Sequence, residues 1–170
     1  INANQQMLLR AAQILKTTPG ELDSRIEQQL TEMKDLRQHL EQMKAEASLG
    51  EARSFLMSAK DVGGFKVLTA HKDGMDAAAL RQMGDFLRDK EPSVVAVLAS
   101  VNGEKITFQA VCGPEAVKRG IKAGELVKQV CGICGGKGGG KPDSAMGGGS
   151  DLLKIDDALA SVDDFVAGKL

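Results

Sequence analysis

The stretch Cys134-Gly-Gly-Lys-Gly-Gly-Gly-Lys-Pro-Asp-Ser-Ala-Met-Gly-Gly-Gly-Ser150 decides how the rest of the chain is interpreted. It holds eight glycines in seventeen residues, with Lys137 and Lys141 inside the glycine run. Glycine loses the most conformational entropy on ordering, so such a run is either a flexible spacer or a place where the backbone must approach something closely. Helical patterns precede and follow it. We therefore predict a glycine-rich binding loop, residues 134–150, held between two ordered elements.

The segments around this stretch predict one small domain over residues 51–170. Residues 121–134 and 156–165 have helical periodicity, and a helix over 76–90 ends before Pro92. Strands are expected at 65–70, at 93–100 as a buried strand, and after the Asn102-Gly103 hairpin turn as a partner with one half-exposed face. A turn is expected at Val62-Gly63-Gly64, and residues 51–60 fit either a helix end or a strand. This order predicts an α+β (α/β mixed) fold with a mixed sheet flanked by helices.

Residues 1–50 predict a helical arm that precedes this domain. A first helix is expected over residues 5–16, and Thr18-Pro19-Gly20-Glu21 has the pattern of a capping box that opens a second, long helix. The apolar positions of that helix form a narrow seam: Leu22, Ile26, Met33, Leu36, Leu40 and Met43. The seam can pack on the chain's own domain, on residues 5–16 as a helical hairpin, or on a partner helix from another chain.

The charge of the chain is balanced overall and uneven locally. The formal net charge is -1 and the pI is about 6.2, so no global basic field indicates a nucleic-acid partner. Residues 113–142 nevertheless carry six basic and two acidic side chains, whereas residues 143–170 carry six Asp and two Lys. Basic residues on the approach to the glycines, Lys118, Arg119 and Lys122 among them, are compatible with phosphate binding and equally with a solvated helix face.

The catalytic motifs that glycine-rich runs suggest do not fit the spacing here. The best Walker A register, Gly135 to Gly140-Lys141, is followed by Pro142 in place of the Ser or Thr that holds magnesium. No register gives Gly-x-Gly-x-x-Gly, and the run follows a helix and not a strand. With two histidines far from any nucleophile motif, we predict no catalytic residues and no cofactor.

The chain has three cysteines, Cys112, Cys131 and Cys134, and the last two are predicted to be buried thiols. Cys131-Gly-Ile-Cys134 has the spacing of half a zinc site or of a redox pair, but both cysteines also fit the apolar face of their helix. No metal site is therefore predicted. An odd cysteine count, no signal peptide and no long apolar run indicate no membrane segment and a reducing compartment. The expected location is the cytoplasm, with an organellar parent left open, and the first residues suggest a piece of a longer chain.

Recognition of an anion is the remaining interpretation of the glycine run. Successive N–H groups of a glycine-rich turn can form an anion-binding concavity, to which nearby lysines add charge. The predicted contacts are Gly135, Gly136, Lys137, Gly138, Gly139, Gly140 and Lys141 in the loop, with Lys118, Arg119 and Lys122 before it. The chain has no Trp or Tyr, so the contact would recognise phosphate and shape more than bases.

These residues resemble a known family. The run from Cys134 to Asp143, followed by Ala145 and Gly148-Gly149, is similar to the glycine-rich signature near the C-terminus of alanyl-tRNA synthetases, within a nucleic-acid-binding domain that also accompanies DHH-type phosphoesterases. Leu15 to Leu22, the long helix after it and Gly120-Ile-Lys-Ala-Gly124 also resemble that family. The family commonly has Met-Ala-Gln after the Asp, whereas this chain has Ser144-Ala145-Met146.

The resemblance implies a non-catalytic domain of a parent enzyme, alanine–tRNA ligase. In the family this domain binds tRNA, here expected to be alanine-specific, and promotes dimerisation through its helical part, which implies a homodimer through the long helix. Two alternatives stay open. One is a purely structural dimerisation module, and the other is the C-terminal domain of a DHH-type phosphoesterase.

Overall fold

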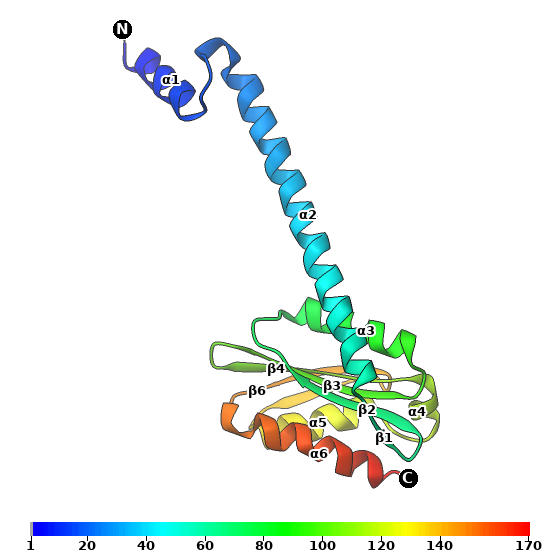
Figure 1. Cartoon of the computed structure of the whole chain (residues 1–170). Helices are drawn as coiled ribbons and strands as arrows, with labels where there is room; N and C mark the ends of the chain where they lie inside the picture. Colours follow the sequence, from blue (N-terminus) through cyan, green and yellow to red (C-terminus); the bar gives the residue numbers. More distant parts are fainter. Residues whose placement is uncertain (1) are drawn as a thin grey trace. The chain divides into compact units, whose positions relative to one another are not determined.

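The computed structural model describes residues 2–170, which divide into two compact units, Ile1–Glu46 and Ala47–Leu170. The predicted α+β class is confirmed: a long helix precedes a mixed sheet that is flanked by helices (Figure 1). Helix α2, Leu22–Met57, contributes residues to both units. Each unit is described separately below.

The first unit contains helix α1, the 3₁₀ turn η1 and most of α2. Helix α1, Ala3–Ile14, opens with a capping box in which the Asn2 side chain accepts from the Gln5 backbone N–H and the Gln5 side chain accepts from the Asn2 N–H. It ends two residues before Lys16, whose φ of 53° is incompatible with continuing a right-handed helix. The predicted helix over 5–16 is therefore confirmed with both ends shifted towards the N-terminus.

The capping box predicted at Thr18 and Glu21 is wrong. Thr18 makes no side-chain bond to a backbone N–H, and residues Pro19–Glu21 form η1 instead. The Glu21 carboxylate accepts from the hydroxyls of Thr17 and Thr18, each at 3.4 Å. Because this carboxylate binds the two hydroxyls, it does not return to the Thr18 N–H as a capping box requires.

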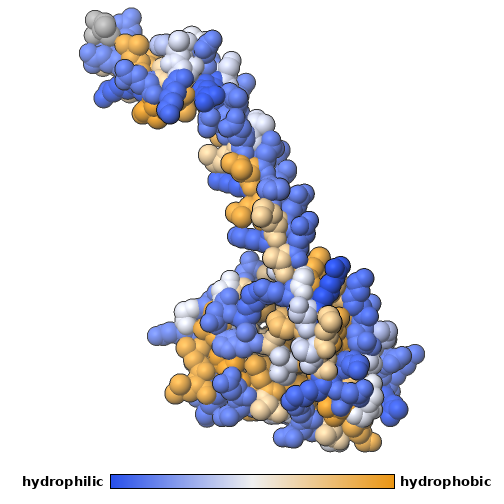
Figure 2. Space-filling view, viewed as in Figure 1, coloured by the Kyte–Doolittle hydropathy of each residue, from blue (hydrophilic) through white to orange (hydrophobic). Residues whose placement is uncertain are grey.

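The apolar seam of α2 is exposed along most of its length. Leu22 is 7% exposed, whereas the remaining predicted positions are between 41% and 68% exposed: Ile26, Met33, Leu36, Leu40 and Met43. Figure 2 shows hydrophobic side chains in a row along this helix. Within the first unit, Leu22 at the start of the seam and Ala12 of α1 are therefore buried, and the rest of the seam is exposed.

The second unit is built on one mixed sheet. Its strands within the described residues are β1 Lys60–Val62, β2 Phe65–His71, β3 Val94–Asn102, β4 Lys105–Cys112, β5 Lys137–Gly140 and β6 Ser144–Gly149. Their order is β1-β2-β3-β4-β6-β5, with β2 and β3 parallel and the other neighbours antiparallel. The parallel pair requires a crossover, which helix α3, Ala77–Lys90, provides.

Helices cover both faces of this sheet (Figure 1). Helices α5, Ala123–Ile133, and α6, Ile155–Ala167, pack on one face around Phe108 and the alternate apolar residues of β3 and β4. Helix α3 packs on the opposite face, together with Ala52 and the end of α2. The short helix α4, Pro114–Lys118, which the sequence did not predict, follows β4, and the 3₁₀ turn η2, Leu152–Lys154, precedes α6.

The ambiguous segment 51–60 is mainly helix, because α2 continues to Met57. Ala52 is fully buried, and Phe55 and Leu56 pack on the cluster beneath α3. This burial offsets the low helix propensity of Gly50, which costs about 1 kcal/mol in a helix interior. Tertiary packing therefore extends the helix past the point where its sequence pattern changes.

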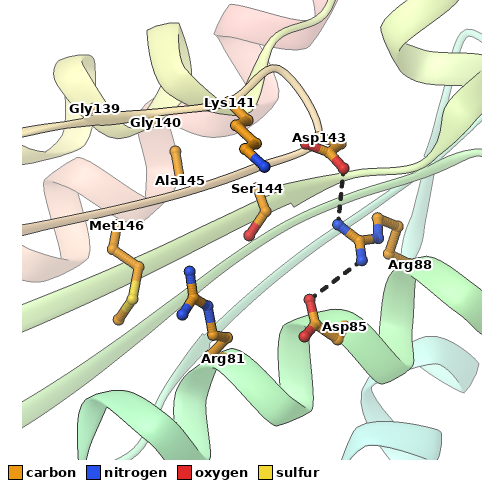
Figure 3. Close-up of a pocket in the computed structure, with 10 residues that line it drawn as sticks. All are labelled: Arg81, Asp85, Arg88, Gly139, Gly140, Lys141, Asp143, Ser144, Ala145 and Met146. Carbon is orange, nitrogen blue, oxygen red and sulfur yellow. Dashed lines mark hydrogen bonds and ion pairs between the residues drawn. The ribbon is translucent and has the colours of Figure 1, made fainter.

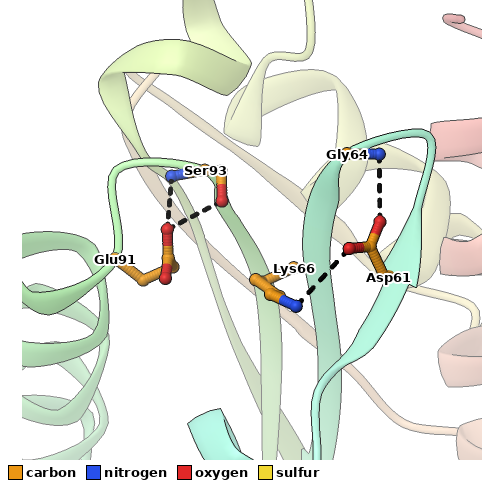
Figure 4. A network of polar contacts seen from close by, with 5 residues as sticks. All are labelled: Asp61, Gly64, Lys66, Glu91 and Ser93. Atoms are coloured by element: carbon orange, nitrogen blue, oxygen red, sulfur yellow. Dashed lines mark hydrogen bonds and ion pairs between the residues drawn. The ribbon is translucent and has the colours of Figure 1, made fainter.

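The predicted turn at Val62-Gly63-Gly64 is confirmed. Gly63 and Gly64 have φ values of 60° and 91°, and the Asp61 carboxylate accepts from the Gly64 N–H at 3.0 Å and pairs with Lys66 Nζ at 3.4 Å (Figure 4). On the neighbouring strand the Glu91 carboxylate accepts from the N–H and hydroxyl of Ser93. These contacts fix the start of each strand in the parallel β2–β3 pair.

Two predictions about the sheet need correction. The segment 134–150 is a β-hairpin and not a loop between helices, because β5 and β6 pair antiparallel and extend the sheet beyond β4. One face of β4 was predicted to be half exposed. This holds for Lys105, which is exposed, and Thr107, which is partly buried, but Gln109 on the same face is fully buried. The physical reason is helix α3, which packs on β4: the Gln109 side chain lies against Gly84 of that helix.

Candidate functional site

The β5–β6 hairpin has two different faces. On the face towards α5, Gly138 and Gly147 lie opposite each other and leave room for that helix. A Cβ on Gly147 would lie 2.5 Å from Cys131 Sγ, and one on Gly138 would overlap Val127 Cγ1. These glycines are therefore required because the helix packs directly on the hairpin backbone.

The opposite face of the hairpin borders a groove. The groove has a volume of about 440 Å³, and its other wall is α3 (Figure 3). It is lined by Arg81, Asp85, Arg88, Gly139, Gly140, Lys141, Asp143, Ser144, Ala145 and Met146. At Gly139 the closest atom to an added Cβ would be Lys128 Cε at 3.9 Å, an ordinary contact. Packing therefore does not explain why this position on the groove lacks a side chain.

Charged side chains of two kinds surround the groove. Arg88 pairs with Asp143 at 3.0 Å and with Asp85 at 3.4 Å, so its charge is largely balanced. Arg81 and Lys141 have no ion-pair partner among residues 2–170. Figure 3 shows both side chains reaching into the groove from opposite walls. Arg81 and Lys141 are thus the cations of the lining without an ion pair, and with Arg88, Asp85 and Asp143 counted the lining has a net formal charge of +1.

A buried polar pair lies on β4 and β6 next to the groove. Gln109, which is fully buried, donates from Nε2 to Ser144 Oγ at 2.9 Å. Gln109 Oε1 is buried and has no hydrogen-bond partner in the described part of the chain. Most buried polar atoms in proteins are hydrogen-bonded. Contacts within the described residues therefore do not explain why this position beside the groove has a glutamine.

The predicted contact residues do not all come together. Gly139, Gly140 and Lys141 line the groove, whereas Gly138 faces α5. Gly135 and Gly136 lie between α5 and β5, and Lys137 is exposed at the start of β5. Lys122 is the N-cap residue of α5.

Lys118 and Arg119 lie at the end of α4, away from the hairpin glycines. The Arg119 guanidinium lies 5.9 Å from the centre of the Phe65 ring. Lys118 lines a second hollow, of about 680 Å³, whose lining also includes Arg88 and Asp143 of the groove. Lys118 is therefore connected to the groove through the Arg88–Asp143 ion pair, and Arg119 is separate from it.

Sequence reasoning missed the wall that α3 provides. Arg81, Asp85 and Arg88 lie on the side of α3 that borders the hairpin. Their spacing of four and then three residues puts them in one row on the helix. That row was the available signal, but nothing in the sequence placed the hairpin beside it.

The predicted burial of Cys131 and Cys134 is confirmed, and Cys112 is buried as well. All three are fully buried free thiols. Burial raises the pKa of Cys131 from its ordinary value of 9.0 to about 11, with a smaller contribution from Cys134. Burial and then the Asp143 charge raise the pKa of Cys112 to about 12. Thiols this far from ionisation are poor nucleophiles.

The described residues hold neither a cluster of metal ligands nor a membrane-spanning helix. Nowhere in residues 2–170 do three or more His, Cys, Asp or Glu side chains gather in a way that could hold a metal ion. Over the same residues, no helix is both long enough and apolar enough to span a membrane.

Comparison with known proteins identifies the family. The model of the DHHA1 domain matches residues 64–168, which include the whole β5–β6 hairpin and both walls of the groove. The chain belongs to the DHHA1 domain family. Curated relatives are alanine–tRNA ligases: that of Thiobacillus denitrificans is 41% identical over 170 residues, and that of Methylobacillus flagellatus 42%. The match covers 100% of this chain and 19% of each relative, so the chain spans about a fifth of their length.

Solved structures agree with membership of the DHHA1 family. The C-Ala domain of Aquifex aeolicus alanyl-tRNA synthetase has a TM-score of 0.61 and 28% identity, over 65% of this chain and 98% of that one. RecJ of Thermus thermophilus, solved with Mg²⁺, has a TM-score of 0.52 and 15% identity, over 95% of this chain and 24% of that one, which shows the fold alone. The predicted resemblance to the C-terminal domain of alanyl-tRNA synthetase is therefore confirmed.

Proposed function

We propose that this DHHA1 domain binds tRNA for an alanine–tRNA ligase and that the groove between α3 and the β5–β6 hairpin supplies central contacts. The observation that carries the proposal is the pair of cations without an ion pair, Arg81 and Lys141, on opposite walls of a groove whose lining has a net formal charge of +1. Cations of this kind bind phosphate groups and release counterions, which makes affinity depend on salt. The relatives' name supports tRNA as the nucleic acid.

The glycine-rich face of the hairpin supports the same function. At Gly139 a side chain is absent although the space for one exists, and its absence lets a sugar–phosphate backbone come close to the strand. Lys137 pairs with Gly148 in the register of β5 and β6, two residues from the Gly139–Met146 pair, and adds positive charge on the exposed edge strand. Contacts of this type fix position and shape and carry little base information.

The remaining predicted contacts have different roles in this proposal. Lys118 extends the basic surface beyond the Arg88–Asp143 pair, and Lys122 and Arg119 contribute charge at a distance. Gly135, Gly136 and Gly138 act indirectly: Gly135 has a positive φ, Gly136 lies against the backbone of β6, and Gly138 lets the hairpin lie against α5. Mutation of these three glycines would change folding before binding.

The test is a titration of the chain with an alanine-specific tRNA transcript at two salt concentrations. The double substitution Arg81→Ala and Lys141→Ala is expected to lower affinity by at least tenfold and to reduce the salt slope by about 2. The matched control is Lys60→Ala on β1, the opposite edge of the sheet, where an exposed ion pair with Asp163 is lost. Equal affinity and equal slope in the double variant and the wild type would refute the groove as the binding surface.

A second function, homodimerisation, is favoured by one specific observation. The seam of α2 leaves large apolar side chains more than 40% exposed at heptad-like spacing, including Ile26, Leu36 and Leu40. We propose that a second copy of α2 covers this seam. The double substitution Leu36→Glu and Leu40→Glu is then expected to convert a dimer into a monomer in sedimentation velocity at micromolar concentration. If the wild type itself sediments as a monomer, the seam does not dimerise.

A further inference from the structure

The Gln109–Ser144 pair is only half satisfied within the chain. Gln109 Nε2 donates to Ser144 Oγ at 2.9 Å, and the same nitrogen lies 3.5 Å from the carbonyl oxygen of Ala110. The other amide atom, Oε1, is buried without a partner in the described residues. A buried acceptor without a hydrogen-bond partner destabilises a fold, so its presence indicates another role for the residue. The pair therefore requires an explanation other than packing.

The hydroxyl of Ser144 has a free hydrogen. Its oxygen accepts from Gln109, so one lone pair is occupied and the O–H bond is turned away from the amide. No hydrogen bond donated by Ser144 Oγ is present among residues 2–170. Figure 3 shows the Ser144 side chain pointing into the groove, on the side where Lys141 and Arg81 end. A donor whose hydrogen cannot point at Gln109 Nε2 thus lies near the two cations.

We propose that the Ser144 hydroxyl, held in place by Gln109, is a hydrogen-bond donor to a backbone oxygen of the nucleic acid bound in the groove. This inference rests on the proposed function and specifies one contact between the groove and the nucleic acid. Ser144 makes the contact, and Gln109 is a positioning residue that acts through it.

The surroundings of Ser144 favour a backbone oxygen over a base. The two cations without an ion pair, Arg81 and Lys141, attract phosphate groups to the neighbourhood of the hydroxyl. The groove lining contains no aromatic side chain on which a base could stack. An acceptor oxygen of the sugar–phosphate backbone is therefore the atom that reaches Ser144, and it belongs either to a phosphoryl group or to the ribose 2′-hydroxyl.

The test uses the whole chain with three substitutions, Ser144→Ala, Ser144→Thr and Gln109→Met, titrated with the tRNA transcript and with RNA and DNA hairpins of one sequence. If the acceptor is a phosphoryl oxygen, Ser144→Ala weakens binding of RNA and DNA alike by about 10-fold or more, since bonds to charged groups are the stronger kind. If it is the ribose 2′-oxygen, the loss is about 2- to 10-fold and is confined to RNA. Ser144→Thr keeps the hydroxyl and retains at least half of the affinity.

The Gln109→Met variant distinguishes a role of Gln109 in positioning Ser144 from a role in the stability of the fold. Methionine has a similar volume and removes the orphan acceptor, so the thermal midpoint is expected to stay equal or to rise, while affinity falls by part of the Ser144→Ala loss. A purely structural glutamine would show the reverse, a lower midpoint with unchanged affinity. If Gln109→Met does not fold, the comparison of Ser144→Ala with Ser144→Thr decides alone, because Ser144 is only partly buried.

The failure of this inference is distinguishable from failure of the proposed function. Unchanged affinity in Ser144→Ala, together with a loss in the Arg81→Ala and Lys141→Ala double variant, overturns the role of Ser144 and leaves the groove as the binding surface. Equal loss in Ser144→Ala and Ser144→Thr also overturns it. Absence of tRNA binding by the wild-type chain overturns both proposals.

Discussion

Gly138 and Gly139 are neighbours on β5 with opposite structural requirements. A Cβ on Gly138 would overlap Val127 and lie 3.0 Å from Cys131 Sγ, whereas a Cβ on Gly139 would meet nothing closer than 3.9 Å. At the scale of single residues, Gly138 is a glycine that packing against α5 requires, whereas Gly139 is one whose missing side chain would leave room for a ligand. A sequence shows only two adjacent glycines, so the distinction depends on knowing which face of the strand meets α5.

The first prediction uses this pair. Gly138→Ala is expected to lower the free energy of unfolding by about 1–3 kcal/mol, because the methyl group overpacks the contact with α5. Gly139→Ala is expected to change it by no more than about 1 kcal/mol and to weaken tRNA binding roughly fivefold or more, about 1 kcal/mol. Urea unfolding and tRNA titration of both variants check this. A Gly139→Ala variant that binds like the wild type would mean that the ligand does not approach this strand.

The second prediction concerns the pH dependence that Cys112 causes. Its pKa rises from 9.0 to about 12 through burial and then the Asp143 charge. Above pH 9 the unfolded chain releases the thiol proton while the folded chain keeps it, so stability is complete below pH 9 and falls as the pH rises towards 12. The contribution to the slope is at most about 1.4 kcal/mol per pH unit.

Urea unfolding of the wild type and of Cys112→Ala at pH 7.5, 9 and 10 tests this slope. The variant is expected to be less stable at pH 7.5, because it leaves a small cavity, and to lose less stability between pH 9 and 10. The lysines titrate in both proteins and cancel in the comparison. Parallel pH profiles would show that Cys112 does not contribute.

The roles of residues could be predicted where neighbouring residues in one segment indicate the function together. Lys141 and Gly139 were identified from the glycine run and do line the groove. Arg81 and Gln109 were not identified, because each depends on a neighbour distant in sequence: Arg81 on the hairpin, and Gln109 on Ser144, 35 residues away. A residue whose role comes from a contact across the sheet has no local signature.

At the scale of elements, α2 shows how packing overrides local propensity. Gly50 lies inside this helix with no atom within 4 Å of an added Cβ, whereas Gly84 of α3 would place a Cβ 2.8 Å from Val111 Cγ1. Substitution by alanine raises the helix propensity at both positions. We nevertheless expect opposite effects on stability, because only the methyl group at position 84 would clash with the sheet.

The third prediction follows from that contrast. Gly50→Ala is expected to raise the free energy of unfolding by about 0.5–1 kcal/mol, through helix propensity and a less flexible unfolded chain. Gly84→Ala is expected to lower it by about 1–3 kcal/mol, since α3 would be pushed away from β4. Chemical denaturation monitored by circular dichroism gives both values. Stabilisation by both substitutions would contradict the close packing of α3 on the sheet.

The hairpin was mistaken for a loop because β5 contains neither β-branched nor aromatic residues. Strands are usually recognised by β-branched and aromatic residues, and β5 is Lys-Gly-Gly-Gly. Its pairing is set instead by β4, which provides a partner for β6, and by α5, which packs on the glycines. Conversely, the strands at 65–71 and 94–102 and the helix at 77–90 follow their own patterns, and they were predicted within two residues.

At the scale of the whole molecule, nearly all buried apolar residues belong to the second unit. Ala12 and Leu22 are the buried hydrophobic residues found in residues 2–46, and the others begin at Ala52. The α+β class and the flanking helices could be predicted because they follow from the order of elements. The strand order could not, since β6 inserts between β4 and β5 through a hairpin that no local pattern indicates.

The fourth prediction concerns the independence of this unit. A chain of residues 47–170 is expected to unfold cooperatively, with a thermal midpoint within about 5 °C of the full chain, because the first unit contributes little core. It is expected to keep the groove's tRNA affinity within threefold and to lose any dimer that the α2 seam forms. Differential scanning calorimetry and sedimentation of both chains check this. A truncated chain without a cooperative transition would show that residues 2–46 stabilise the sheet.

Cys131 provides a natural probe of the hairpin. Its sulfur lies under Gly138 and Gly147, which have no side chains, so the β5–β6 backbone is what covers it from that side. Any thiol reagent that reaches Cys131 from there requires the hairpin to separate from α5. The labelling rate therefore measures how often the hairpin opens in the native protein. A ligand that binds across the other face of the hairpin should slow this labelling, which would report binding without an added fluorophore.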